Sequence, residues 1–489
     1  MNLITPTEGI ITLVVFTAVM LGLVFFFTRK YFHSKDSFLV ARREVGWIRG
    51  SLSIAVSWIW APAVFIASLQ AYTKGIAGAF WFIVPNIVCF FIFVPLAIRL
   101  RKFMPEGYTL TQFILKRYGN DKKTHLSFLT IFFGYQLGAI IINTLAGAIL
   151  LSILTGISFY MAAIGLTVAV LLYALISGLE ASIITDAIQM GMVLLFCFIL
   201  IPWVIVEAGG FHTVTGGLSG ITGEFGNVFN PWIAFSFGIA TALSLISGPV
   251  GDQMFFQRVY ASKKEQIAKT FIAGGLIFGL VPIILSLPGF IAANPEFSSA
   301  ITVSDPQMVG PLVIGYFLPK AALIGFLFMA FAALASTIDS AYCAISSLGT
   351  VDIYKKYINP EADDKKTLSV SRKLMLFMAL IGTGIALLQP KLLWVFLIYG
   401  AMASAGFFPT YLSLYWSRLT KEGAFWAVTL SLIIGLPISV YANIKENVNL
   451  IVLSAVLSVL IGLVVCLIAG FTNKKTRYNF ETGVTELIE

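Results

Sequence analysis

The chain has 489 residues, of which 58% are hydrophobic and only 11% are charged, and its formal net charge is +9. Soluble domains carry about 25% charged residues, so this composition excludes a water-soluble globular fold and predicts a helical bundle in a bilayer. The basic residues form short clusters between apolar segments, which indicates membrane topology and not a nucleic-acid-binding surface.

Thirteen apolar segments follow one another along the chain, each near the ~20 residues that a bilayer crossing requires. They cover residues 8–28, 47–73, 77–99, 126–154, 158–177, 183–206, 231–253, 269–293, 309–349, 373–389, 392–416, 422–442 and 449–471. With the N-terminus outside, the outer loops hold only Lys74, Lys320, Lys391 and Lys445 of the 32 basic residues. The positive-inside rule therefore favours a multi-pass protein of the plasma (inner) membrane, with its N-terminus outside and its C-terminus cytoplasmic.

The second and seventh segments contain helix-breaking residues. Pro62 lies within 47–73, and Gly248 and Pro249 lie within 231–253. Irregular backbone at membrane depth is tolerated only where it lines a cavity or is covered by protein. Two interrupted spans in matching positions of two halves are typical of an inverted-repeat transporter, although ordinary proline kinks would give the same pattern.

The ninth segment carries a face of small and hydroxyl-bearing residues. Ala333, Ser336 and Thr337 are spaced i, i+3 and i+4, and Ser340 continues their helix face. Hydroxyl oxygens combined with the carbonyl oxygens of an unwound helix suit a hard cation such as sodium. The alternative is close helix packing, which also favours Ala, Ser and Thr.

Acidic residues within or beside apolar segments are further candidates. Asp186 and Asp339 should face a cavity, pair with a base or bind an ion, although Asp186 could instead be hydrated near the cytoplasmic interface. Asp252 precedes Gln253 and Arg258 at an inner helix end, where we expect structural or gating contacts, with Asp252 paired to a nearby base. No nucleophile–base pair or metal-ligand spacing indicates an enzyme.

Four stretches, in order along about residues 36–470, resemble the sodium:solute symporter family. They are DSFLVARREVGWIRGSLSIAVS, SGLEASIITDAIQ, GDQMFFQRVYASK and FAALASTIDSAYCAISSLGTVDIYKKY. The second departs from the family's signature at Ser177, which stands where the family has the first Gly.

The resemblance implies an all-α membrane fold with a LeuT-type core, in one transporter domain over 1–489. An extra first helix at 8–28 precedes a first inverted repeat over 47–206. A second inverted repeat of five helices lies within 231–442, with the eleventh helix at 392–416 on its peripheral side. Two extra helices follow at the C-terminal end, the last of them over 449–471.

The resemblance also implies a sodium site. The family's ligands match Ala333, Ser336 and Thr337, together with backbone carbonyls that align near Ala55 and Trp58.

Some family members hold a second ion. Its Asp matches Asp186, and Ser336 and Ser340 could supply hydroxyls. Asp339 occupies a place that is often Ser, so the chain departs here from the family's pattern for the second ion. The candidates for this site are Asp186, Asp339 and Ser340.

The stretch SWIWAPAVFIASLQAYTKGIAGAFWF resembles the urea-transporter branch of the family. Sugar-carrying members have polar residues where this chain has Pro62 and Phe80, and proline carriers have an acid near Ser57. A small neutral solute fits better, and Ser57, Trp60, Phe80 and Ser244 are the candidates for lining its site. The alternative is that the aromatic residues only pack helices or sit at the membrane interface.

Together these features predict a sodium-coupled symporter of urea or a urea-like amide that works by alternating access. The alternatives are a sodium or proton symporter of an amino acid, monocarboxylate or sugar, and a transporter-like sensor. The expected partners are the solute, a sodium ion and the bilayer, and the sequence does not predict the oligomeric state.

Overall fold

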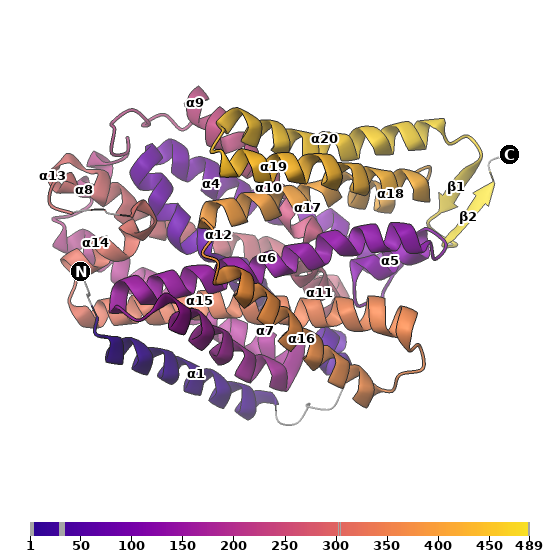
Figure 1. The fold of residues 1–489 in the computed structure, drawn as a ribbon, viewed down its shortest axis with the longest axis horizontal. Helices are drawn as coiled ribbons and strands as arrows, with labels where there is room; N and C mark the ends of the chain where they lie inside the picture. The colour runs from indigo at the N-terminus through magenta and orange to yellow at the C-terminus, as the bar shows by residue number, and fades with distance from the viewer. Residues whose placement is uncertain (1–3, 29–34, 302, 304, 488–489) are drawn as a thin grey trace.

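The structure, a computed structural model, describes residues 4–28, 35–301, 303 and 305–487. It is a bundle of long helices that run roughly side by side, with one small hairpin (Figure 1). Within the described residues, 12 helices are long and apolar enough to cross a membrane, which confirms the predicted all-α membrane fold.

The long helices are α1 Pro6–Thr28, α4 Ala61–Phe103, α6 Lys122–Thr155, α7 Phe159–Glu207, α12 Ile267–Ala293, α15 Lys320–Ser347, α16 Asp364–Ala386, α17 Leu392–Tyr415 and α20 Val448–Thr472. The shorter ones are α2 Lys35–Val40, α3 Trp47–Ser57, α5 Leu110–Arg117, α8 His212–Gly216, α9 Pro231–Ile233, α10 Ile239–Ser247, α11 Gln253–Ala261, α13 Pro295–Ser298, α14 Val309–Phe317, α18 Lys421–Leu430 and α19 Leu436–Ile444. Three π-helical stretches, Ala234–Gly238, Leu348–Ile358 and Ser431–Gly435, extend or join neighbouring helices.

The count of 12 differs from the 13 predicted spans, and the difference lies in residues 47–103. α3 has 11 residues, too few for a crossing, and α4 has 43, too many for one. α4 bends where Lys74 and Gly75 leave helical geometry, and Gly75 has φ +54° and ψ −152°. Only glycine adopts such a conformation without strain, so the sequence places the bend here.

The second segment is broken between α3 and α4, as the sequence predicts. Trp58, Ile59 and Trp60 are not helical, and Pro62 lies in the first turn of α4. The backbone N–H of Ala61 donates to Asn143 Oδ1 of α6 at 2.8 Å, so a side chain replaces the helical carbonyl as acceptor. The break is therefore covered by protein, as an interruption at membrane depth requires.

The seventh segment changes its geometry near the predicted interruption. α10 ends at Ser247, the backbone tightens into a 3₁₀ turn at Gly248–Gly251, and Asp252 is extended. α11 then begins at Gln253, with the Asp252 carboxylate accepting a hydrogen bond from the Met254 N–H at 2.7 Å. The interruption therefore lies at the end of the predicted segment, where a buried short helix follows it.

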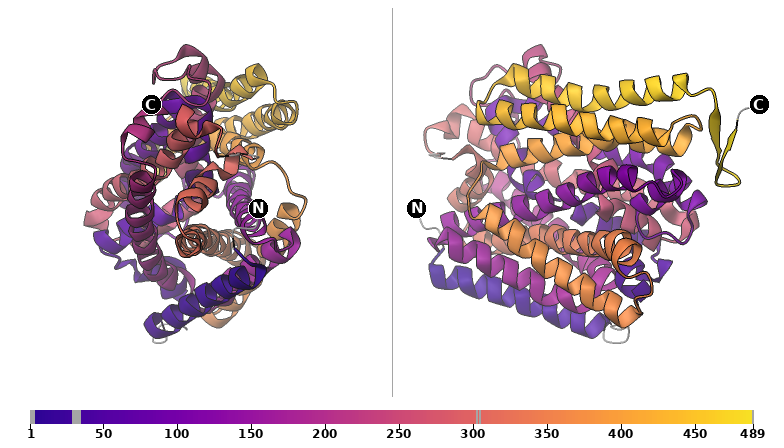
Figure 2. Two further views of the ribbon diagram at one scale, coloured as in Figure 1. Left: turned by 90° about the vertical axis from the view of Figure 1, so that its left-hand side faces the viewer. Right: turned by 45° about the vertical axis from the view of Figure 1, so that its right-hand side comes forward.

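α6 and α15 form the centre of the bundle, because 78% of the most apolar stretch of each is buried, against 22% for α1. α1 and the pair α18 and α20 lie at opposite edges (Figures 1 and 2). After α20 the chain forms an antiparallel hairpin of β1 Thr476–Asn479 and β2 Val484–Leu487, which the sequence analysis did not predict. The hairpin is anchored where the Tyr478 N–H donates to the Ser417 carbonyl at 2.8 Å.

Candidate functional site

The break between α3 and α4 lies against Thr337 of α15. The Thr337 hydroxyl oxygen is 3.2 Å from the carbonyl oxygen of Ile59 and 3.4 Å from those of Ser57 and Ala333. Carbonyls at a break lack the N–H partners that a continuous helix would give them. One hydroxyl and three carbonyl oxygens therefore converge, a ligand set suited to a hard monovalent cation.

Of the sodium ligands that the family resemblance implies, Ala333 and Thr337 lie at the break. The Ala55 carbonyl accepts a hydrogen bond from the Trp58 N–H at 3.3 Å, and the Thr337 hydroxyl contacts the carbonyls of Ser57 and Ile59 instead. The hydroxyl of Ser336 donates to Asp186 Oδ1 at 2.5 Å, so it points toward a second polar cluster.

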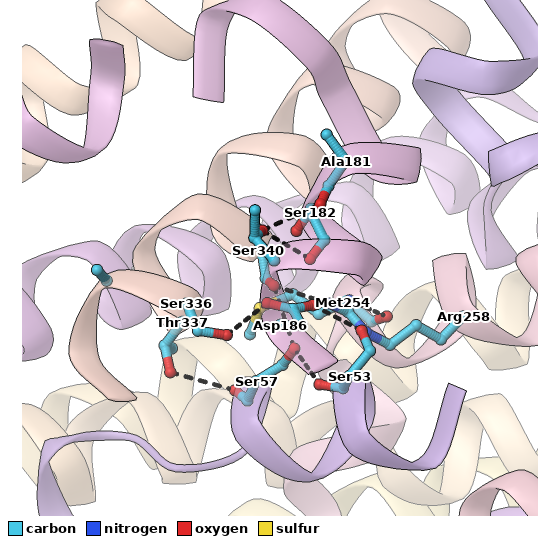
Figure 3. A network of polar contacts seen from close by, with 12 residues as sticks. Ser53, Ser57, Ala181, Ser182, Asp186, Met254, Arg258, Ser336, Thr337 and Ser340 are labelled. Atoms are coloured by element: carbon cyan, nitrogen blue, oxygen red, sulfur yellow. Dashed lines mark hydrogen bonds and ion pairs between the residues drawn. The ribbon is translucent and has the colours of Figure 1, made fainter. Parts of the chain in front are cut away.

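This second cluster joins α3, α7, α11 and α15 (Figure 3). Asp186 Oδ2 accepts hydrogen bonds from Arg258 Nη2 at 2.7 Å and from the Ser53 hydroxyl at 2.6 Å. Arg258 Nε also donates to Ser53 Oγ at 2.9 Å. Asp186 is 0% exposed and Arg258 is 1% exposed, so Asp186 is not hydrated at an interface but forms a buried ion pair.

Arg258 occupies the space between the oxygens considered for a second ion. Its Nη2 donates to Ser340 Oγ at 2.7 Å as well as to Asp186, and its Nη1 donates to the Met254 carbonyl at 3.1 Å. The Ser340 hydroxyl also lies 3.1 Å from that of Ser57. The Arg258 guanidinium therefore supplies the positive charge that balances the Asp186 carboxylate, in the place where a second ion was expected.

A pocket lies against the broken segment. It is lined by Trp58, Trp60, Pro62, Ala63, Phe82, Asn86, Tyr135, Ser244, Leu245, Phe396 and Gly400, none of which is charged. Its volume of about 20 Å³ holds about one water molecule. A larger ligand therefore requires its walls to move.

Aromatic rings and a few polar groups form the pocket walls. The ring of Trp60 lies 5.0 Å from that of Tyr135, and the Trp58 indole N–H donates to Asn86 Oδ1 at 3.0 Å. The Trp60 indole nitrogen is buried and has no hydrogen-bond partner among the described residues. An unsatisfied buried donor costs about 1–3 kcal/mol, so a ligand with an oxygen acceptor would be stabilised here.

The structure brings together two of the four predicted solute-lining residues, Trp60 and Ser244. The hydroxyl of Ser57 instead donates to the Ser53 carbonyl at 2.7 Å in the ionic cluster. Phe80 packs on Phe229, with ring centroids 5.5 Å apart, away from the pocket. It lies two residues, or ~200° of helix rotation, from the lining residue Phe82, so it faces the other way.

The predicted gating residues make separate contacts. Asp252 Oδ1 accepts a hydrogen bond from Gln136 Nε2 at 2.7 Å, so its side-chain partner is an amide and not the expected base. Arg258 pairs with Asp186 instead. Gln253 Nε2 donates to the Tyr108 carbonyl at 3.0 Å and thereby ties α11 to the loop before α5.

The sequence analysis missed several buried polar residues that shape the site, among them Asn86, Tyr135, Gln136 and Asn143. Gln136 and Asn143 are seven residues apart in an apolar segment and so share one helix face. Polar side chains inside a membrane span are costly and usually functional, so this spacing was the signal that could have identified them.

Comparison with known proteins gives relatives along most of the chain. A model of the sodium:solute symporter family matches residues 38–435. The chain is 25% identical to the urea-proton symporter DUR3 of Oryza sativa subsp. japonica, over 80% of this chain and 58% of the relative. It is also 25% identical to probable urea active transporter 1 of Schizosaccharomyces pombe, over 78% and 61% respectively. The chain thus spans less than two thirds of the length of these relatives.

A solved structure of a Na⁺-coupled sialic acid symporter in a substrate-bound outward-open state is similar in fold. Its TM-score is 0.77, and the match covers 94% of this chain and 98% of that one at 16% sequence identity. Identity this low carries information about the fold alone.

Proposed function

The chain belongs to the sodium:solute symporter family, and we propose that it couples sodium entry to the uptake of a small neutral solute, urea or a urea-like amide. The sodium would bind at the break, with Ala333, Thr337 and the neighbouring carbonyls as ligands. Ser336, Ala55 and Trp58 would join this set if the break rearranges when the ion binds.

One observation carries the proposal: the non-helical residues 58–60 border both sites. The carbonyl of Ile59 lies at Thr337, while the side chains of Trp58 and Trp60 line the pocket. A cation that fixes the conformation of residues 58–60 also fixes the positions of Trp58 and Trp60 in the pocket wall. A solute that fixes these two side chains in turn holds the Ile59 carbonyl in place for the cation. Such coupling of binding free energies is necessarily reciprocal.

The pocket chemistry supports a neutral solute. A charged ligand would need a counter-charge in this buried site, and none of the lining residues supplies one. The indole N–H of Trp60, which has no partner in the described part of the chain, suits a carbonyl oxygen, and the aromatic rings suit a flat molecule. The names of two relatives, a urea-proton symporter and a probable urea active transporter, favour the same class of solute.

We further propose thirteen crossings with a LeuT-type inverted repeat. The start of α1 and the β1–β2 hairpin lie at opposite ends of the bundle, which an odd number of crossings requires (Figure 1). The basic loops favour an outside N-terminus in the plasma (inner) membrane. The membrane potential would then contribute about 2.3 kcal/mol of driving force per sodium ion for each 100 mV.

The test is uptake of labelled urea by the purified full chain in liposomes, with and without an inward sodium gradient. We expect the gradient to accelerate and concentrate urea uptake. Urea flux that ignores sodium would reject the symport. Sodium-driven flux of proline, glucose or acetate without flux of urea or acetamide would reject only the choice of solute.

A matched pair of variants separates the site from general effects on the helix. Thr337→Ala removes the hydroxyl at the break and should weaken sodium activation. Ser346→Ala removes a buried hydroxyl of the same helix that donates to the Cys343 carbonyl of its own turn at 2.8 Å, and it should leave sodium activation unchanged. Equal behaviour of the two variants would count against the sodium site.

A further inference from the structure

The β1–β2 hairpin contacts the ends of two helices that line the solute pocket. α4 supplies Ala63, Phe82 and Asn86 to the pocket wall, and α17 supplies Phe396 and Gly400. The hairpin lies at the same end of the bundle as α5, the end that the proposed topology places in the cytoplasm (Figure 1). A contact that joins α4 to α17 at this end therefore limits how far the pocket can open there.

The base of the hairpin is fixed to the loop between α17 and α18. The Tyr478 N–H donates to the Ser417 carbonyl at 2.8 Å. Just before the hairpin, Asn473 Nδ2 donates to the Arg418 carbonyl, also at 2.8 Å. Both acceptors follow the end of α17 directly, so we expect the hairpin to move with that end.

Two aromatic side chains of the hairpin extend from this base to α4 and α5. The ring of Phe480 stacks on that of Phe103, the last residue of α4, with centroids 5.1 Å apart and planes 21° apart. The ring centroid of Tyr478, a buried residue, lies 4.0 Å from the guanidinium carbon of Arg117 in α5. The hairpin therefore bridges two segments that the sequence analysis assigns to different repeats.

Arg99, in the last turns of α4, joins the same parts of the molecule. Its Nε donates to the Leu414 carbonyl of α17. Its guanidinium carbon lies 4.9 Å from the ring centroid of Phe103, 4.3 Å from that of Tyr415 and 4.9 Å from that of Phe480. These rings come from α4, α17 and the hairpin, and each attracts the cation through its face. Phe480 therefore covers the direct link between α4 and α17.

The contacts between the hairpin and α4 are of a kind that can break and form again. They are ring stacking and a cation–π contact, and no hydrogen bond or ion pair between the hairpin and α4 is found in the described part of the chain. The two strands pair with each other through the backbone, and Val484 of the outer strand is 59% exposed. The hairpin can therefore separate from α4 without losing its own pairing.

We propose that the β1–β2 hairpin is a latch, which holds the cytoplasmic ends of α4 and α17 together and releases α4 when the pocket opens to the cytoplasm. This inference rests on the proposed symport function. The pocket volume of about 20 Å³ means that its walls must separate before a solute can leave. In the latched state Phe480 lies on Phe103 and Arg99, and in the released state it leaves both.

The first test joins the hairpin to α4 through a removable covalent link. Lys102→Cys and Glu481→Cys place thiols at two exposed positions, next to the stacked rings of Phe103 and Phe480. The four native cysteines are buried, so a flexible bis-methanethiosulfonate, added before reconstitution, should link only the new pair. We expect the link to abolish sodium-driven urea uptake in liposomes and a reductant to restore it. Uptake that the link leaves unchanged would overturn the latch.

A control places the same link within the hairpin. Arg477→Cys and Glu486→Cys lie opposite each other in the register of β1 and β2, so this link spans only the two strands. It should leave urea uptake unchanged. An equal loss of uptake with both pairs would overturn the inference, because the loss would then not depend on the contact with α4.

A distance measurement provides a readout that does not depend on transport. Spin labels at positions 102 and 481 report the separation of the hairpin from α4 by pulsed electron paramagnetic resonance. We expect two separations. Phe480→Leu, which removes the ring and keeps an apolar side chain, should shift their ratio toward the longer one by about 2- to 30-fold, the effect of losing a cation–π contact. A single separation, with and without sodium and urea, would overturn the latch.

The two tests also distinguish the latch from the proposed function. Sodium-driven urea uptake that persists through the link to α4 rejects the latch and leaves the symport intact. Two separations in a chain without sodium-driven urea uptake support the latch and reject the proposed function.

Discussion

Replacement of Thr337 by Val tests the cation site while keeping the shape of the side chain. Thr337 is fully buried, and its hydroxyl oxygen lies within 3.4 Å of the carbonyl oxygens of Ser57, Ile59 and Ala333. A contact between a polar group and a charge contributes about 1.5–3 kcal/mol. Its loss should therefore raise the sodium concentration for half-maximal urea uptake by roughly 10- to 150-fold.

The assay is initial urea uptake in liposomes over a range of external sodium at constant ionic strength. Thr337→Ser keeps the hydroxyl and should retain most of the sodium affinity. The thermal unfolding temperature of each purified variant in detergent shows whether a loss reflects misfolding. A folded Thr337→Val chain with the sodium dependence of wild type would refute the assignment of this oxygen to the ion.

Three further predictions follow from single contacts. Trp60→Phe removes the indole N–H. If that group donates a neutral hydrogen bond to urea, its loss should raise the KM for urea by about 3- to 10-fold. An unchanged KM would show that urea binds elsewhere. Asp186→Asn leaves the Arg258 charge buried without its partner, so it should lower the free energy of unfolding by about 3–5 kcal/mol and lower the unfolding temperature. The double variant Asp186→Leu, Arg258→Met removes both charges and should restore the unfolding temperature. Gly75→Ala should lower the free energy of unfolding by about 1–3 kcal/mol, because φ at position 75 is +54° and the added Cβ would lie 2.5 Å from the Leu218 carbonyl oxygen. The control Gly22→Ala, in open space within α1, should leave the unfolding temperature the same or raise it slightly.

The position of the first break shows what local sequence can and cannot specify. Pro62 predicts an interruption in the second segment, and one is present. Proline fits the first turn of a helix, where its missing N–H is not needed, so the non-helical residues 58–60 precede it. Their exact position also depends on Asn143, which binds the Ala61 N–H from another helix. That contact joins residues 82 positions apart and is not visible in local sequence.

The residues of the site divide in the same way between local helix spacing, which the sequence predicts, and contacts between helices, which it does not. Helical spacing correctly places Ala333 and Thr337 on one face, because that geometry is local. The family resemblance predicts Phe80 in the pocket, but the helix phase after the bend at Gly75 turns Phe82 into it instead. The pairing of Arg258 with Asp186 crosses between α11 and α7, so it depends on tertiary packing and not on spacing.

The central claim is that one broken segment links the cation to the solute, and reciprocity gives its most direct test. Liposomes containing the full chain are prepared with equal sodium on both sides, the membrane potential is clamped at zero, and an inward gradient of urea alone is imposed. We expect net inward movement of labelled sodium, driven by the urea gradient alone, and we expect Thr337→Val to abolish this movement. Urea entry without any accompanying sodium movement would contradict it.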